Sequence, residues 1–120
     1  MATTHIRTED LPRKRTEGAG ELAEILNKEL CGAENVAGRL RWLDAGDRFE
    51  AEALSATHQL VYLMEGNGTI TLNGEDYDVA KGAGIYLGPD ETASIRHRGQ
   101  GRLKLFHLIV PIRSEKQLDA

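Results

Sequence analysis

The sequence predicts an all-β domain, a small jelly-roll barrel or sandwich, on three observations. From residue 36 onward, short apolar runs alternate with turn signals at intervals of about 8–12 residues, which is typical of sandwiches and barrels. Asn73-Gly74 is the strongest short hairpin signal, because both central residues of a type I′ turn require positive φ. The chain of 120 residues has room for one such domain.

About eight strands are expected in this region, joined by turns rich in glycine, asparagine and aspartate. They span residues 36–43, 48–54, 59–65, 69–72, 75–79, 84–87, 92–97 and 103–110. Residues 1–20 are expected to form a polar N-terminal arm, residues 21–112 the barrel domain, and residues 113–120 a polar tail.

A helix is expected over residues 21–30, before the first predicted strand. Leucine and isoleucine recur there at helical spacing, and Gly32 follows as a stop signal. The basic cluster Arg13-Lys14-Arg15 in the arm is interpreted as solvated rather than as an anion site.

Composition excludes several classes of protein. With 40% hydrophobic and 28% charged residues the chain is not disordered, and a net charge of −4 argues against a nucleic-acid partner. The single cysteine, Cys31, excludes a disulfide scaffold or a thiolate metal cluster and favours a reducing compartment. The longest apolar run, residues 105–111, is too short to cross a bilayer, and residues 1–20 lack the apolar region of a signal peptide. We therefore expect a cytoplasmic protein with neither a nucleic-acid nor a membrane partner.

The glycine spacing between residues 46 and 97 resembles the two motifs of the cupin family. The first motif, G(X)5HXH(X)3,4E(X)6G, is matched in spacing by Gly46, Glu52-Ala53-Leu54, Gln59 and Gly66. The second, G(X)5PXG(X)2H(X)3N, is matched in spacing by Gly82, Gly88-Pro89-Asp90, Ala93 and His97. Residues 67–81 separate the motifs, as in a minimal cupin. The resemblance covers residues 36–111 and implies a cupin-type jelly roll.

Cupins typically hold Fe, Mn, Ni or Zn with three histidines and one glutamate. In the register of the resemblance those four positions are Glu52, Leu54, Gln59 and Ala93. Leu54 and Ala93 cannot coordinate an ion, Gln59 offers a neutral carbonyl oxygen, and a lone carboxylate does not hold a divalent ion tightly. The metal chemistry of the family is therefore not carried over, and no cofactor is expected.

Strand alternation, propagated from these positions, predicts a mostly aliphatic cavity with a few polar groups, the ordinary form of a small-molecule site. The predicted polar groups are Glu52, Gln59, His97 and His107. Glu52 and His107 are the candidate catalytic pair, since a carboxylate in an apolar site beside an imidazole suits metal-free proton transfer. Gln59, His97, Tyr86 and Trp42 are the candidate substrate-binding residues, with Tyr86 expected near the mouth.

Each of these residues also has a plainer interpretation. His107 can be a hydrogen-bonded core histidine, His97 a solvated residue at the rim, and Trp42 a packing residue. Glu52 can be solvated if its strand twists, since a buried unpaired carboxylate is costly. His58 is out of phase with Gln59 and is expected to face outward, unless a bulge at residues 55–57 reverses it.

Three functions follow as alternatives. The first is a metal-independent lyase or isomerase that dehydrates or epimerises a small polar organic molecule, and the second is a non-catalytic metabolite-binding module. The third is a metal-dependent, dioxygenase-like cupin whose rearranged ligands would be Glu52, His58, His97 and His107.

A homodimer is expected because an open jelly roll leaves edge strands to be covered. Small cupins usually pair across a two-fold axis, and the outward-facing Leu60, Tyr62 and Met64 form an apolar row. The alternative is a monomer whose N-terminal helix covers this row.

Overall fold

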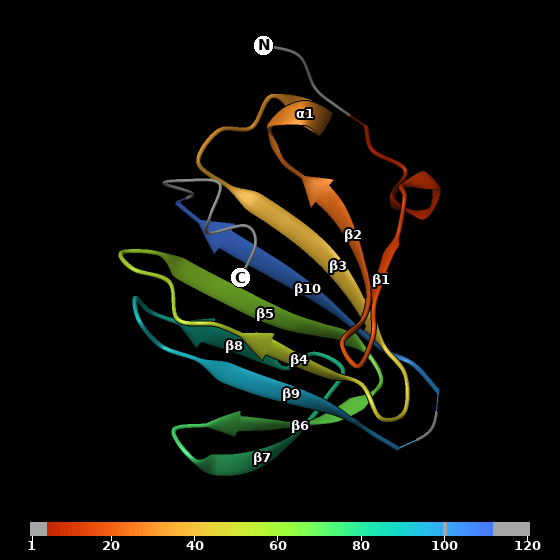
Figure 1. Ribbon diagram of the computed structural model, residues 1–120, viewed down its shortest axis with the longest axis vertical. Helices are drawn as coiled ribbons and strands as arrows, with labels where there is room; N and C mark the ends of the chain where they lie inside the picture. Colours follow the sequence, from red (N-terminus) through yellow and green to blue (C-terminus); the bar gives the residue numbers. More distant parts are fainter. Residues whose placement is uncertain (1–4, 100, 112–120) are drawn as a thin grey trace.

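The computed structural model describes residues 5–99 and 101–111, which fold into two antiparallel sheets that face each other (Figure 1). The larger sheet has the order β1 (Lys14–Thr16), β2 (Gly20–Leu26), β3 (Ala37–Leu43), β10 (Leu103–Val110), β5 (His58–Glu65) and β8 (Gly84–Leu87). The smaller sheet has the order β4 (Arg48–Ala51), β9 (Ala93–Arg98), β6 (Asn67–Leu72) and β7 (Glu75–Ala80). The predicted all-β jelly roll is confirmed. The predicted tail, residues 113–120, lies outside the described residues.

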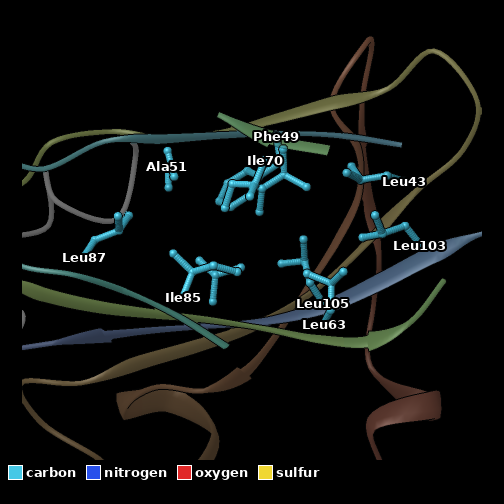
Figure 2. Packing of buried hydrophobic residues seen from close by; sticks show 12 residues of the cluster. Leu43, Phe49, Ala51, Leu63, Ile70, Ile85, Leu87, Leu103 and Leu105 are labelled. Carbon is cyan, nitrogen blue, oxygen red and sulfur yellow. The ribbon is translucent and has the colours of Figure 1, made fainter. Parts of the chain in front are cut away.

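One hydrophobic core lies between the sheets, because successive side chains of a strand point to opposite faces. In β10 the buried residues are Leu103, Leu105, His107 and Ile109, so His107 faces the interior as strand alternation predicted. Figure 2 shows Phe49, Ala51 and Ile70 of the smaller sheet facing Leu63, Ile85 and Leu105 of the larger one. Fully burying one such leucine or isoleucine stabilises the fold by about 1.5–3 kcal/mol.

The hairpin predicted at Asn73-Gly74 is confirmed. Asn73 has φ 51° and Gly74 φ 80°, and the turn joins β6 to β7 with Leu72 opposite Glu75. A tighter constraint acts at Gly66, where φ is 88° and a Cβ atom would lie 2.6 Å from the carbonyl oxygen of Arg102. Only glycine fits at that turn.

The helix predicted over residues 21–30 is wrong. Residues 20–26 form β2, which pairs with β1 on one side and β3 on the other, and the helix is only α1 (Lys28–Cys31). The Asn27 side chain caps it by accepting from the Leu30 N–H at 2.9 Å, and Gly32 ends it with φ 74°. A ten-residue segment cannot sustain a helix alone, whereas as a strand it packs Ala23 against Leu40 and Trp42. No helix in the described part of the chain has the length and hydropathy needed to cross a membrane.

The N-terminal hairpin of β1 and β2 is tied to the rest of the domain by ion pairs at one end of the sheet. Arg102, which precedes β10, donates from Nε to Asp44 at 2.8 Å and from Nη2 to Glu21 at 2.6 Å. We call Arg102, Asp44 and Glu21 the clasp. It joins three segments that are far apart in the sequence, and one of them is β2, which was expected to be a helix.

Candidate functional site

The centre of the site is His107, on the inner face of β10. Its Nε2 lies 2.7 Å from Oε1 of Gln59, whose Nε2 donates to the backbone carbonyl of Glu52 at 2.9 Å. Because the amide NH₂ of Gln59 is used by that carbonyl, its oxygen is the group that faces the imidazole. His107 therefore donates from Nε2 and carries a lone pair on Nδ1. That Nδ1 is buried and has no hydrogen-bond partner among the described residues.

The imidazole of His107 is uncharged at neutral pH. Burial is the main cause that lowers its pKa to about 3, and the nearby charges of Arg41 and Arg39 lower it further. An imidazole with so low a pKa is a hydrogen-bonding group with one donor and one acceptor, and it is a poor base.

Two buried arginines lie on the same inner face, on β3. Arg39 is directly opposite His107 and Arg41 is opposite Leu105 in the antiparallel ladder, and residues directly opposite share a face. Arg39 forms an ion pair with Glu24, with 3.2 Å between Nε and Oε1.

Arg41 packs against an aromatic ring. Its Cζ lies 4.0 Å from the centre of the Phe49 ring. The same ring meets the imidazole of His107 edge-on, with 5.1 Å between ring centroids and 64° between planes. Burial, with the charge of Arg39, lowers the pKa of Arg41 to about 10, so the guanidinium stays charged at neutral pH.

Neither arginine was predicted from the sequence as a site residue. The available signal was their alternation with Leu40 and Trp42 inside the strand predicted at residues 36–43. All seven residues of β3 are buried, so both of its faces are covered and the arginines cannot reach bulk water as surface residues do.

The predicted pairing of Glu52 with His107 is wrong. Phe49 and Ala51 of β4 point inward, the strand ends at Ala51, and Glu52 has an exposed side chain. Only its backbone carbonyl reaches the site, through Gln59. The cause is local. β4 ends at Ala51, although the aligned cupin motif would continue the strand through Glu52, and the chain returns to the interior at Leu54.

Gln59 is the one predicted substrate-binding residue that lies deep inside beside His107. Trp42 is buried on the outer face of the larger sheet, with Leu40 and Ala23, under the guanidinium of Arg13 at 3.8 Å. Tyr86 also points outward and is 61% exposed. Strand alternation explains both, since Trp42 and Tyr86 each neighbour an inward-facing residue.

The other two candidate histidines, His58 and His97, lie apart from His107. His58 is exposed, as predicted, and its Nδ1 lies 2.6 Å from the hydroxyl of Tyr86. His97 is half-buried, two residues beyond Ile95 of the core, and its Nε2 lies 2.5 Å from the carbonyl oxygen of Gly101. His97 therefore belongs to the rim near the β9–β10 turn.

The donor set does not fit the divalent metal that the cupin resemblance implies. Leu54 and Ala93 are buried hydrocarbon, and the Glu52 carboxylate is exposed. The three histidines of the rearranged ligand set are also apart, because His58 contacts Tyr86, His97 contacts Gly101 and His107 contacts Gln59. Within residues 5–99 and 101–111, no three histidine, cysteine, aspartate or glutamate side chains are arranged to hold a metal ion.

The two-sheet jelly roll and its inward-facing polar cluster define the protein as a small cupin domain. The family model of the AraC-like ligand binding domain matches residues 39–114, so the chain belongs to that family. The match begins at Arg39 and includes His107 and Gln59.

Solved structures support the fold. A predicted oxalate decarboxylase from Thermotoga maritima superposes with a TM-score of 0.81 at 20% identity, covering 91% of this chain and 100% of that one. An RmlC-like cupin from Shewanella frigidimarina has a TM-score of 0.74 at 14% identity, covering 96% of each chain. The polyketide cyclase RemF from Streptomyces resistomycificus has a TM-score of 0.73 at 15% identity, covering 92% of this chain and 80% of that one. A search of curated proteins found no match.

Proposed function

We propose that this protein is a non-catalytic binding domain that holds a small organic molecule inside the barrel, against His107. The observation that carries the proposal is the buried lone pair of Nδ1, which has no partner among the described residues. An unsatisfied buried polar atom costs about 1–3 kcal/mol. A ligand that donates a hydrogen bond there recovers this free energy, and membership in a family of ligand binding domains supports the same role.

The metal-independent lyase or isomerase is the second candidate and is less well supported. A general base works best with a pKa near the working pH, and the pKa of His107 is lowered to about 3. Its intended partner, Glu52, has an exposed carboxylate. The metal-dependent alternative requires a ligand set that the described residues do not bring together.

Binding and turnover can be tested together. Wild-type protein is titrated with a panel of glycerol, erythritol, glucose, lactate and alanine, by calorimetry and by NMR of the histidine rings, and each mixture is then checked for new products. We expect at least one compound to bind saturably and remain chemically unchanged. His107→Phe, which keeps a ring against Phe49, is expected to weaken that binding at least about tenfold.

His58→Phe is the matched control, since His58 is exposed on the outer face, and it should leave the affinity unchanged. If His107→Phe alone fails to fold, the double variant His107→Phe/Gln59→Met removes the polar pair together. Conversion of a ligand to product would favour the enzyme, and no saturable binding by any compound would overturn the proposal.

The homodimer remains a prediction. The outer face of β5, β8 and β10 exposes Leu60 (38%), Tyr62 (42%), Tyr86 (61%) and Val110 (38%). The alternative was a monomer whose N-terminal helix covers the apolar row of Leu60, Tyr62 and Met64. That helix, α1, is only four residues long. Light scattering of wild type and Tyr62→Glu is the measurement, and a monomeric mass for the wild type at high micromolar concentration would contradict the dimer. The cytoplasmic location, inferred from Cys31, also stays a prediction.

A further inference from the structure

We propose that the ligand is a small carboxylic acid whose carboxylate is bound by Arg41, while a donor group of the same molecule reaches His107. This inference rests on the proposed function of the barrel interior and names the class of ligand.

Arg41 is a charged side chain with no ion-pair partner among the residues that the structure describes. It is only 8% exposed, and its Nε has no hydrogen-bond partner among the described residues. Its contact there is the face of Phe49, which attracts the cation but accepts no hydrogen bond from Nε. A guanidinium presents its N–H groups in a planar fork that matches a carboxylate.

Glu24 is the nearby carboxylate, and it is already engaged. Its Oε1 pairs with Arg39 at 3.2 Å, and its Oε2 accepts from the Asn27 amide at 2.9 Å. Glu24 is therefore not free to pair with Arg41 as well, and the imidazole of His107 is neutral. Among the described residues, the Arg41 guanidinium has no paired carboxylate, whereas buried ionised groups persist when they are paired.

The position of His107 adds a second requirement for the ligand. Arg41 and His107 both contact Phe49, and they lie on the adjacent strands β3 and β10, diagonal to each other in the ladder. Diagonal neighbours in a sheet are about 7–8 Å apart between backbone positions, within the span of a small molecule between long side chains. The unpartnered Nδ1 accepts, so the ligand must carry a hydroxyl or N–H group as well as the carboxylate.

The first test compares acids with their neutral amides. Lactate and lactamide, glycolate and glycolamide, and 3-hydroxybutyrate with its amide are titrated by NMR at constant ionic strength. We expect each acid to bind about 10–100-fold more tightly than its amide, the range for hydrogen bonds to charged groups. Propionate, which lacks the hydroxyl group of lactate, is expected to bind more weakly than lactate.

Arg41→Met should abolish the preference for acid over amide, and Arg48→Met should preserve it. Arg48 is the matched control, because it lies on β4 with 52% of its side chain exposed and an ion pair to Glu50. Arg41→Lys keeps the charge without the planar fork, and an intermediate preference is expected.

A second measurement does not depend on tight binding. Without ligand, Arg41→Met is expected to melt at a higher temperature than wild type, because a buried charge without a counter-ion is replaced by an apolar chain of similar volume. Lactate should raise the melting temperature of the wild type and leave that of Arg41→Met unchanged.

The outcomes separate this inference from the proposed function. If neutral compounds bind as well as acids, and binding depends on His107 but not on Arg41, the inference fails while the binding function stands. If chloride raises the melting temperature as much as lactate does, the site is an unspecific anion site and the inference fails. If no compound binds at all, both proposals fail.

Discussion

Two parts of the interior lie between the sheets and differ in the kind of side chain that fills them. Around Ile70, Ile85 and Leu63 the side chains are hydrocarbon, 8% exposed or less, and need no partner other than each other. Around Arg41 and His107 the side chains are equally buried but carry polar atoms, two of which lack partners among the described residues. We call these the apolar half and the polar half of the core.

On the proposed function, this difference separates the residues that stabilise the domain from those that bind the ligand. The apolar half contributes the packing that holds the two sheets together. The polar half lowers stability in the absence of a ligand, and stability sacrificed at one place in a fold commonly marks a site of function. Substitutions in the two halves and at the surface should therefore have different effects on stability.

The largest effect is expected in the apolar half. Ile70→Ala should lower the free energy of unfolding by about 2–5 kcal/mol, because it removes a fully packed side chain and leaves a cavity. Chemical denaturation measures this change. Tyr77→Ala is the control, since Tyr77 is the cross-strand partner of Ile70 yet is 47% exposed, and it should cost far less. If Ile70→Ala lowered the free energy of unfolding no more than Arg41→Met does, the division of the core into an apolar and a polar half would be wrong.

The next effect is a pH dependence from His107. The pKa of this residue falls from an ordinary value of 6.5 to about 3 on folding, so between these values the unfolded chain binds more protons than the folded one. Stability is therefore full above about pH 6.5 and is lost as the pH falls toward 3, by up to about 1.4 kcal/mol per pH unit.

Urea denaturation between pH 5.5 and 7.5 measures this slope in a window about one pH unit or more above the ordinary pKa of aspartate and glutamate. His107→Phe is expected to flatten the slope. An unchanged slope in that variant would assign the pH dependence to other groups.

A smaller effect is expected from Gln59→Leu. This change leaves the Nε2–H of His107 and the carbonyl of Glu52 without the partner they now share, at a cost of about 1–3 kcal/mol. It also removes the contact that selects the tautomer, so the ring NMR spectrum of His107 should change from a single Nε2–H form to a mixture. A spectrum that kept the Nε2–H form alone would mean that another group selects the tautomer.

The smallest effect is expected at the clasp. A hydrogen bond from Arg102 is the main cause that lowers the pKa of the Glu21 and Asp44 carboxyls. Because both lie at the surface, Arg102→Gln should lower the melting temperature only slightly, and the difference should shrink in concentrated salt. A loss as large as that of Ile70→Ala would place a main source of stability outside the core.

Alternation within strands was predictable from the sequence because it is a local property. The inward set of β10, the positions of Gln59 and Val61 in β5, and the Asn73-Gly74 hairpin all follow from a two-residue period and from turn chemistry. The cupin resemblance rests on glycines at turns, where backbone conformation selects the residue without reference to distant contacts. These features determined the fold class correctly.

The tertiary structure alone decided which side chains share the polar half. Glu52 is excluded because the pairing of β4 with β9 stops at Ala51, opposite Ala93, and the end of a pairing depends on another strand. Residues 20–26 became a strand because β3 provided an edge for them, which outweighed their helical spacing. Arg41 lies against the ring of Phe49 from the opposite sheet, and Arg39 pairs with Glu24 on the neighbouring strand β2. No local pattern in the sequence of β3 records either contact.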